Sequence, residues 1–78
     1  MTMSVPPFDP AAVCLRIRSL VEFNGTVVEV ANTCGIKVPT LETVIYGKGL
    51  PGAMTLACLS RGLQVSVDWL LFGEAANG

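Results

Sequence analysis

The side chains able to perform covalent, acid–base or metal chemistry are few in this chain and lie far apart along it. The sequence has no histidine, and its three cysteines, Cys14, Cys34 and Cys58, form no paired CxxC spacing. A zinc site would therefore have too few ligands. No pair of carboxylates has a spacing suited to acid–base catalysis, and no glycine-rich phosphate loop follows a strand pattern. We expect no enzyme activity, no metal and no cofactor, and we interpret the cysteines as buried, reduced thiols of a cytoplasmic protein.

Recognition of a macromolecule is the chemistry that remains, and the residues for it lie in the middle of the chain. Thr26 is followed three residues later by Glu29, a capping-box spacing that begins a helix. Gly35 fits the end of that helix, because a residue without Cβ tolerates a positive φ. Pro39 suits the first turn of a second helix. Helix, tight turn and helix form a helix-turn-helix pattern. The two predicted helices cover about 26–33 and 38–46.

Three further helices are predicted on either side of this central pair. Asp9 and Pro10 begin the first, since aspartate accepts hydrogen bonds at a helix cap and proline suits the first position. Pro51 takes a first-turn position in the next helix, which Gly62 ends, and Ser66 caps a last short helix. The predicted ranges are about 10–23, 51–61 and 67–72, between a flexible N-terminal arm at 1–8 and a disordered tail at 74–78.

With short links and no alternating strand pattern, the chain is predicted to be all-α, with a single domain at residues 9–73. Hydrophobic residues make up 51% of it, whereas 14% are charged, against roughly 25% in a typical soluble protein. We expect a dense core and some exposed apolar surface, which usually indicates a partner. The net charge of −1 gives no general attraction for nucleic acid. No apolar run approaches the roughly 20 residues of a membrane span, so no membrane partner is expected.

The apolar spacing also predicts which side chains face the core. Arg16 lies away from the apolar stripe of the first helix. In the second helix of the central pair, Leu41 and Val44 face inward, which leaves Ile45 and Tyr46 on an outer face.

Residues at fixed offsets across most of the chain match a known pattern. The most specific part is the run Gly62-Leu63-x-Val65-Ser66-x-Asp68-Trp69-Leu70-Leu71-Phe72-Gly73-Glu74, preceded by Gly47-x-x-x-Pro51, Leu56 and Leu59. The other matches are Arg16-Ile17-Arg18-x-Leu20 and, in the central pair, Ala31, Gly35, Ile36, Thr40, Leu41 and Val44. Through these residues the chain resembles, over about 15–74, the lambda-repressor/Cro-like (XRE) family of DNA-binding domains.

This resemblance implies a five-helix lambda-repressor-like helix-turn-helix domain. It further implies a transcriptional regulator related to phages or mobile elements, a homodimer that binds operator DNA through the helix at about 38–46. The candidate DNA-contacting residues are Thr26, Val27, Lys37, Val38, Thr40, Thr43 and Lys48, and the candidate dimer contacts are Leu71 and Phe72.

The same surface fits a second function. Val38 and Tyr46 stand where a DNA reader would place polar side chains, and the two lysines between residues 24 and 51 are balanced by two glutamates. The fold would then serve protein binding, as an antiactivator or a docking module for a partner such as a transcription factor, with little or no DNA binding. The candidate partner surface consists of Val27, Val28, Val38, Ile45 and Tyr46. The alternative is that the helix phase is shifted by one position and that Val28 and Ile45 belong to the core.

Overall fold

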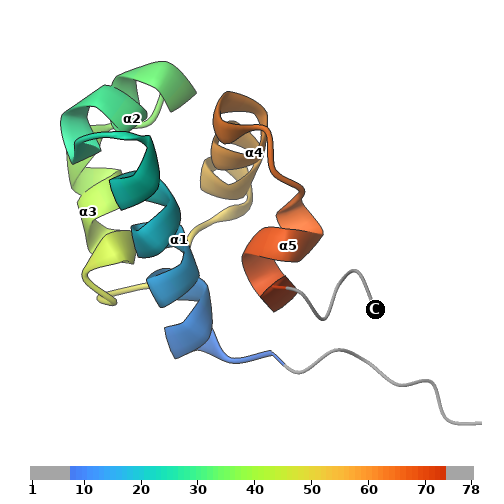
Figure 1. Cartoon of the computed structure of the whole chain (residues 1–78). Coiled ribbons are helices and arrows are strands. Elements are labelled where there is room, and N and C mark those ends of the chain that lie inside the picture. Colours follow the sequence, from blue (N-terminus) through green and yellow to red (C-terminus); the bar gives the residue numbers. More distant parts are fainter. Residues whose placement is uncertain (1–7, 74–78) are drawn as a thin grey trace, which may run out of the picture.

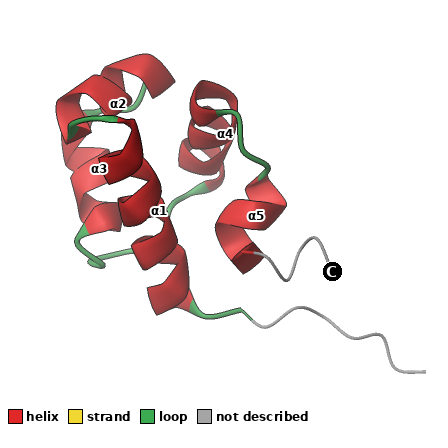
Figure 2. Ribbon diagram, in the orientation of Figure 1, coloured by secondary structure: helices red, strands yellow, loops and turns green. Residues whose placement is uncertain are grey.

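The structure is a computed structural model that describes residues 8–73. These residues form five α-helices (Figures 1 and 2). They are α1 (Pro10–Asn24), α2 (Val27–Cys34), α3 (Val38–Ile45), α4 (Ala53–Leu63) and α5 (Val67–Phe72). No strand occurs among these residues, so the predicted all-α class is confirmed. The expected arm and tail lie, apart from Phe8, outside the described residues. Within residues 8–73, no helix combines the length and the apolar character needed to cross a membrane.

Side chains predicted to cap α1 and α5 make the expected contacts. Asp9 Oδ1 accepts a hydrogen bond from the backbone N–H of Ala11 at 3.0 Å, and Pro10 occupies the first position of α1. Ser66 Oγ accepts from the backbone N–H of Trp69 at 3.0 Å. The local sequence therefore determines where these two helices begin, and both predictions are confirmed.

α1 lies between the other helices, with α2 and α3 on one side of it and α4 and α5 on the other in Figure 1. It packs against α2, α3 and α5, while α4 packs against α2 and α5. Each large apolar side chain buried in such a core stabilises the fold by roughly 1.5–3 kcal/mol. The largest fully buried side chains are Val13, Ile17, Val21, Val30, Leu41, Leu59 and Leu70.

The start and the end of α4 differ from the sequence prediction. Pro51 precedes the helix, which begins after the N-cap Gly52, and Gly62 lies inside it. A Cβ at position 62 would overlap the Sγ of Cys34 and lie 3.0 Å from its Cα. Gly62 therefore permits the close approach of α4 to α2 and does not end the helix. Gln64, in the left-handed region at φ 57°, is the residue at which α4 ends.

Arg16 lies off the buried stripe of α1, as predicted, and is half-buried where α1 meets α5. Its Nη1 donates a hydrogen bond to the carbonyl oxygen of Leu70 at 2.8 Å, and its Cζ lies 5.9 Å from the centre of the Trp69 ring. That carbonyl belongs to the last turn of α5, where the helix dipole favours a cation. Arg16 therefore joins the first helix to the last, a role that the sequence alone did not indicate.

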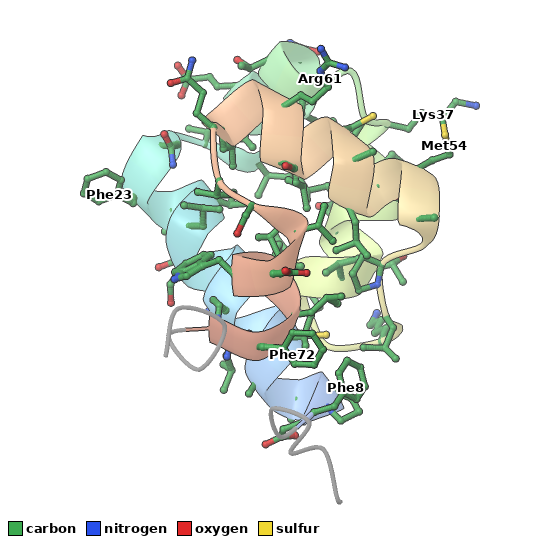
Figure 3. All side chains as sticks on the ribbon, turned by 90° about the vertical axis from the view of Figure 1, so that its right-hand side faces the viewer. Phe8, Phe23, Lys37, Met54, Arg61 and Phe72 are labelled. Carbon is green, nitrogen blue, oxygen red and sulfur yellow. The ribbon has the colours of Figure 1, made fainter. Side chains whose placement is uncertain are left out.

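The two candidate dimer contacts lie at the end of α5. Leu71 and Phe72 are both half-buried, and Leu71 packs against the core. The ring of Phe72 meets the exposed ring of Phe8 edge-on, with centroids 6.3 Å apart (Figure 3). Both candidate residues therefore have contacts within the chain and still keep some exposed surface.

Candidate functional site

α3 presents one face to the core and another to solvent. It follows Gly35, which adopts the left-handed conformation at φ 72° and ψ 32° that the tight turn requires. Leu41 and Val44 are buried, whereas Thr40 and Thr43 are exposed. The turn and the facing of these four side chains are as predicted.

The candidate DNA-contacting residues divide into an exposed and a half-buried group. The exposed group is Thr26, Lys37, Thr40, Thr43 and Lys48, and the half-buried group is Val27 and Val38, which pack against the core. The hydroxyl of Thr43 donates to the carbonyl oxygen of Pro39 at 3.0 Å, so its oxygen remains available to a ligand as an acceptor. Directional contacts to a macromolecule would therefore come from the exposed group.

The N-terminus of α2 is occupied by side chains of the same segment. The backbone N–H of Thr26 donates to Oε1 of Glu29 at 3.0 Å, and the backbone N–H of Glu29 donates to Oγ1 of Thr26 at 3.2 Å. This is the predicted capping box, which is confirmed. The backbone hydrogen bond from Thr26, with a smaller contribution from its side chain, lowers the pKa of Glu29 below its usual value of 4.5. An ionised carboxylate therefore lies where a phosphate would approach this helix, and it would repel the phosphate.

The candidate protein-partner residues do not form one exposed surface. Ile45 is buried, with 7% of its surface exposed, so the prediction that it faces outward is wrong, and the alternative that it belongs to the core is correct for this residue. It lies four residues after Leu41, and residues at this spacing share one side of a helix. The buried side of α3 is wide enough to include both. Of the remaining four, Val27 and Val38 are half-buried, and Val28 and Tyr46 are exposed.

A groove of about 540 Å³ lies between α1 and the segment that follows α3. We call it the α1/α3 groove; it is lined by residues 10, 11, 14, 15 and 18 of α1 and by residues 45–50. Cys14 Sγ donates to the carbonyl oxygen of Gly49 at 3.6 Å and so connects the two walls. A smaller hollow of about 230 Å³ is lined by Pro39, Glu42, Thr43, Tyr46 and Lys48. Tyr46 and Lys48 line both depressions.

Sequence reasoning did not single out Leu15 and Leu50 as candidate site residues. Both line the groove, with 62% and 50% of their surfaces exposed. One signal for Leu15 is visible in the sequence, because it is a large apolar residue off the stripe formed by Val13 and Ile17. No such signal in the sequence marks the opposite wall of the groove, at residues 45–50, because the position of that wall depends on how α3 packs against α1.

The three cysteines lie in apolar surroundings. Cys14 and Cys34 are buried, Cys58 is half-buried, and all three are free thiols. Burial raises the pKa of the Cys34 thiol, and the neighbouring Cys58 raises it further. In the described part of the chain, no three His, Cys, Asp or Glu side chains are grouped so that they could hold a metal ion. Cys34 therefore acts as a small apolar side chain and not as a nucleophile.

Comparison with known proteins identifies no family. No protein-family model matches the chain, and no curated protein or solved structure matches it. A functional interpretation therefore depends on the outer face of α3 and on the α1/α3 groove.

Proposed function

We propose that this chain is a helix-turn-helix regulator of transcription that binds double-stranded DNA through α3. The observation that carries the proposal is the outer face of α3. Pro39, Thr40 and Thr43 are exposed on it, and the exposed Lys37 and Lys48 lie at its two ends. A helix that presents hydroxyls between two cations fits the major groove, where hydroxyls reach base edges and ammonium groups reach phosphates.

Each exposed residue has a distinct role in this proposal. Thr40 contacts a base edge as donor or acceptor, whereas Thr43 accepts only, because its proton is engaged by Pro39. An acceptor at this position favours the amino groups of adenine or cytosine. Lys37 and Lys48 contact phosphates on either side. The resemblance to lambda-repressor/Cro-like domains supports this arrangement and implies a homodimer on a two-fold operator, with Leu71 and Phe72 as its contacts.

The small number of cations predicts weak binding by one subunit. Two lysines at the α3 face correspond to a slope of log affinity against log salt of roughly −1.8 per subunit. Glu42 on α3 and Glu29 at the start of α2 oppose phosphate approach. Dimerisation is therefore needed for useful affinity.

The second candidate function is protein binding with little or no DNA binding, and one observation favours it. The carboxylate of Glu29 occupies the start of α2, a place where DNA readers commonly contact phosphate. In this alternative the exposed Tyr46 anchors a partner, since tyrosine is enriched among residues that dominate binding energy.

The two candidates are separated by titrating the purified chain with labelled, fragmented DNA from the source genome at about 50 and 200 mM salt. DNA binding predicts salt-sensitive anisotropy. It also predicts that Lys37→Gln and Lys48→Gln each reduce the magnitude of the salt slope by about 0.9. Arg61→Gln is the matched control, because it removes an exposed cation from α4, away from α3 (Figure 3). Binding that is absent at both salt concentrations, or equal losses in all three variants, would contradict the DNA proposal.

A further inference from the structure

We infer that the α1/α3 groove is a docking site for an acidic amphipathic helix of a partner protein. This site lies beside the outer face of α3 and shares Lys48 with it, but docking in the groove does not depend on DNA binding. The shape, the apolar surface and the charge of the groove each contribute to the inference.

The length of the groove matches a short helix. Its α1 wall consists of residues 10, 11, 14, 15 and 18, which lie on one side of the helix. At 1.5 Å per residue, this wall is about 12 Å long. Anchors at positions i, i+3 or i+4, and i+7 of a docked helix span about 10.5 Å, so they fit along it.

The groove exposes large apolar side chains that the core of the monomer does not cover. Cys14 and Ile45 are buried at its floor, while Leu15, Tyr46 and Leu50 stand at its edges with half or more of their surfaces exposed. Three large, half-exposed side chains around one depression resemble the centre of an interface, where such residues are covered by a partner.

The charged side chains that line the groove are all positive. Arg18 and Lys48 line it, and none of the residues lining it carries a carboxylate. Arg18 pairs with Glu22 through its Nε at 3.0 Å, which leaves its terminal guanidinium nitrogens available to a ligand. The complementary partner is therefore apolar on one side and acidic at its flanks.

A helix fits this site better than an extended peptide or a small molecule. The groove lies between a helix and a loop, so an added strand would find no sheet edge for its backbone N–H and C=O groups. A docked helix satisfies these groups internally. Small-molecule sites typically enclose about 70–90% of their ligand, whereas Leu15, Tyr46 and Leu50 at this groove keep half or more of their surfaces exposed.

A docked helix would also affect the proposed DNA contact. Lys48 and Tyr46 line both the groove and the smaller hollow beside α3. A partner whose carboxylate binds Lys48 removes a cation from the DNA-facing side. This competition rests on the proposed function, whereas docking itself does not.

The test uses the ¹⁵N-labelled full chain and helical peptides of about 12 residues, with apolar anchors at i, i+3 or i+4 and i+7 and glutamates at the flanking positions. The anchors are leucine, isoleucine or phenylalanine, and each peptide has a lysine-for-glutamate counterpart. We expect the acidic peptides alone to shift the amide resonances of Leu15, Tyr46 and Leu50. Lys48→Glu should weaken binding at least about tenfold, and Leu50→Ala should do the same.

Arg61→Glu and Phe23→Ala are the matched controls, because they change an exposed cation and an exposed aromatic on other surfaces of the molecule (Figure 3). Both should leave peptide affinity unchanged. Lys48 is exposed, so its charge reversal should not affect the core, and the amide spectrum reports folding in each variant. No DNA is present, so a failure of peptide binding is separate from a failure of the proposed DNA contact.

Several results would overturn the inference. One is the absence of shifts at the groove with every acidic peptide; another is equal binding of the acidic and basic peptides. A third is that decanoate, a small amphipathic carboxylate, shifts these resonances while the peptides do not. A fourth is that the same resonances shift when the chain alone is diluted, which would assign the groove to a second copy.

Discussion

The starts of α2 and α3 are built differently, although the two helices are close in sequence and of equal length. α2 begins with a closed pair, in which Thr26 and Glu29 satisfy each other's backbone N–H groups. α3 begins at Lys37, whose side chain makes no capping hydrogen bond, and its start relies on Pro39 in the first turn. The side chains at the start of α2 therefore accept hydrogen bonds from the backbone N–H groups of Thr26 and Glu29, whereas the start of α3 has no side-chain acceptor.

This difference indicates which helix start could accept an outside ligand. The first N–H groups of a helix attract anions when no side chain occupies them. At α2 an ionised carboxylate already does so, whereas at α3 the adjacent side chain is the cation of Lys37. In the proposed function, phosphate therefore approaches the start of α3 and not that of α2.

The largest expected effect comes from loosening the close contact between α2 and α4 at Gly62. Gly62→Ala places a Cβ against Cys34 and should destabilise the protein by about 2 kcal/mol or more, although alanine has a helix propensity about 1 kcal/mol better than glycine. Urea unfolding measures the loss. Gly52→Ala is the control, because the space around Gly52 is open, and it should cost at most about 1 kcal/mol.

A partial recovery in the double variant Gly62→Ala/Cys34→Ala would identify the Sγ of Cys34 as the main obstacle. A neutral or stabilising effect of Gly62→Ala would contradict the close approach of α4 to α2 described above.

The next effect tests the two helix starts directly. Thr26→Ala removes the capping hydroxyl and should reduce the free energy of unfolding by about 1 kcal/mol. Lys37→Ala removes a side chain that makes no capping bond, so its change should stay within about 0.5 kcal/mol. Both are measured by chemical denaturation at neutral pH. Equal losses in the two variants would mean that the helix starts do not differ in the way described.

The smallest effect is a pH dependence at the start of α2. The pKa of Glu29 is lower in the folded chain than its usual value of 4.5, so its stabilisation is complete above that value. The stabilisation is lost as the pH falls through the lower, folded-state pKa. Glu29→Gln keeps a capping side chain without the charge, so the wild type should have the higher melting temperature at neutral pH. That difference should narrow as the pH falls below 4.5. A difference that stays constant on acidification would contradict the prediction.

The features that could be predicted from the sequence are those decided within a few residues. Asp9, Thr26 and Ser66 cap helices because their acceptors reach backbone N–H groups of the next turn. The turn at Gly35 could be predicted because its positive φ is a conformation that glycine adopts readily. The number and type of the helices follow from these signals together with the apolar spacing.

The features that the sequence predicted wrongly or did not indicate concern residues whose role depends on another helix. Gly62 has the local character of a helix end, and only the closeness of α2 explains why it lies inside α4. Arg16 is polar and off the apolar stripe, but α5 supplies a carbonyl and an aromatic face that hold it. The same limit applies to the candidate site: the exposure of Thr40 and Thr43 followed from helical spacing, whereas the burial of Ile45 and the α1/α3 groove required the packing of α3 on α1.

The hydrogen bond from Arg16 to Leu70 joins residues 54 positions apart, and Leu70 is fully buried. During synthesis on the ribosome, α1 is therefore exposed long before the helix that completes its core is made. α1 packs against α5, so the apolar side of α1 lacks this cover until α5 has emerged, and the domain can reach its final packing only then. A chain cut short before residue 67 should expose this apolar surface and become a substrate for chaperones and proteases.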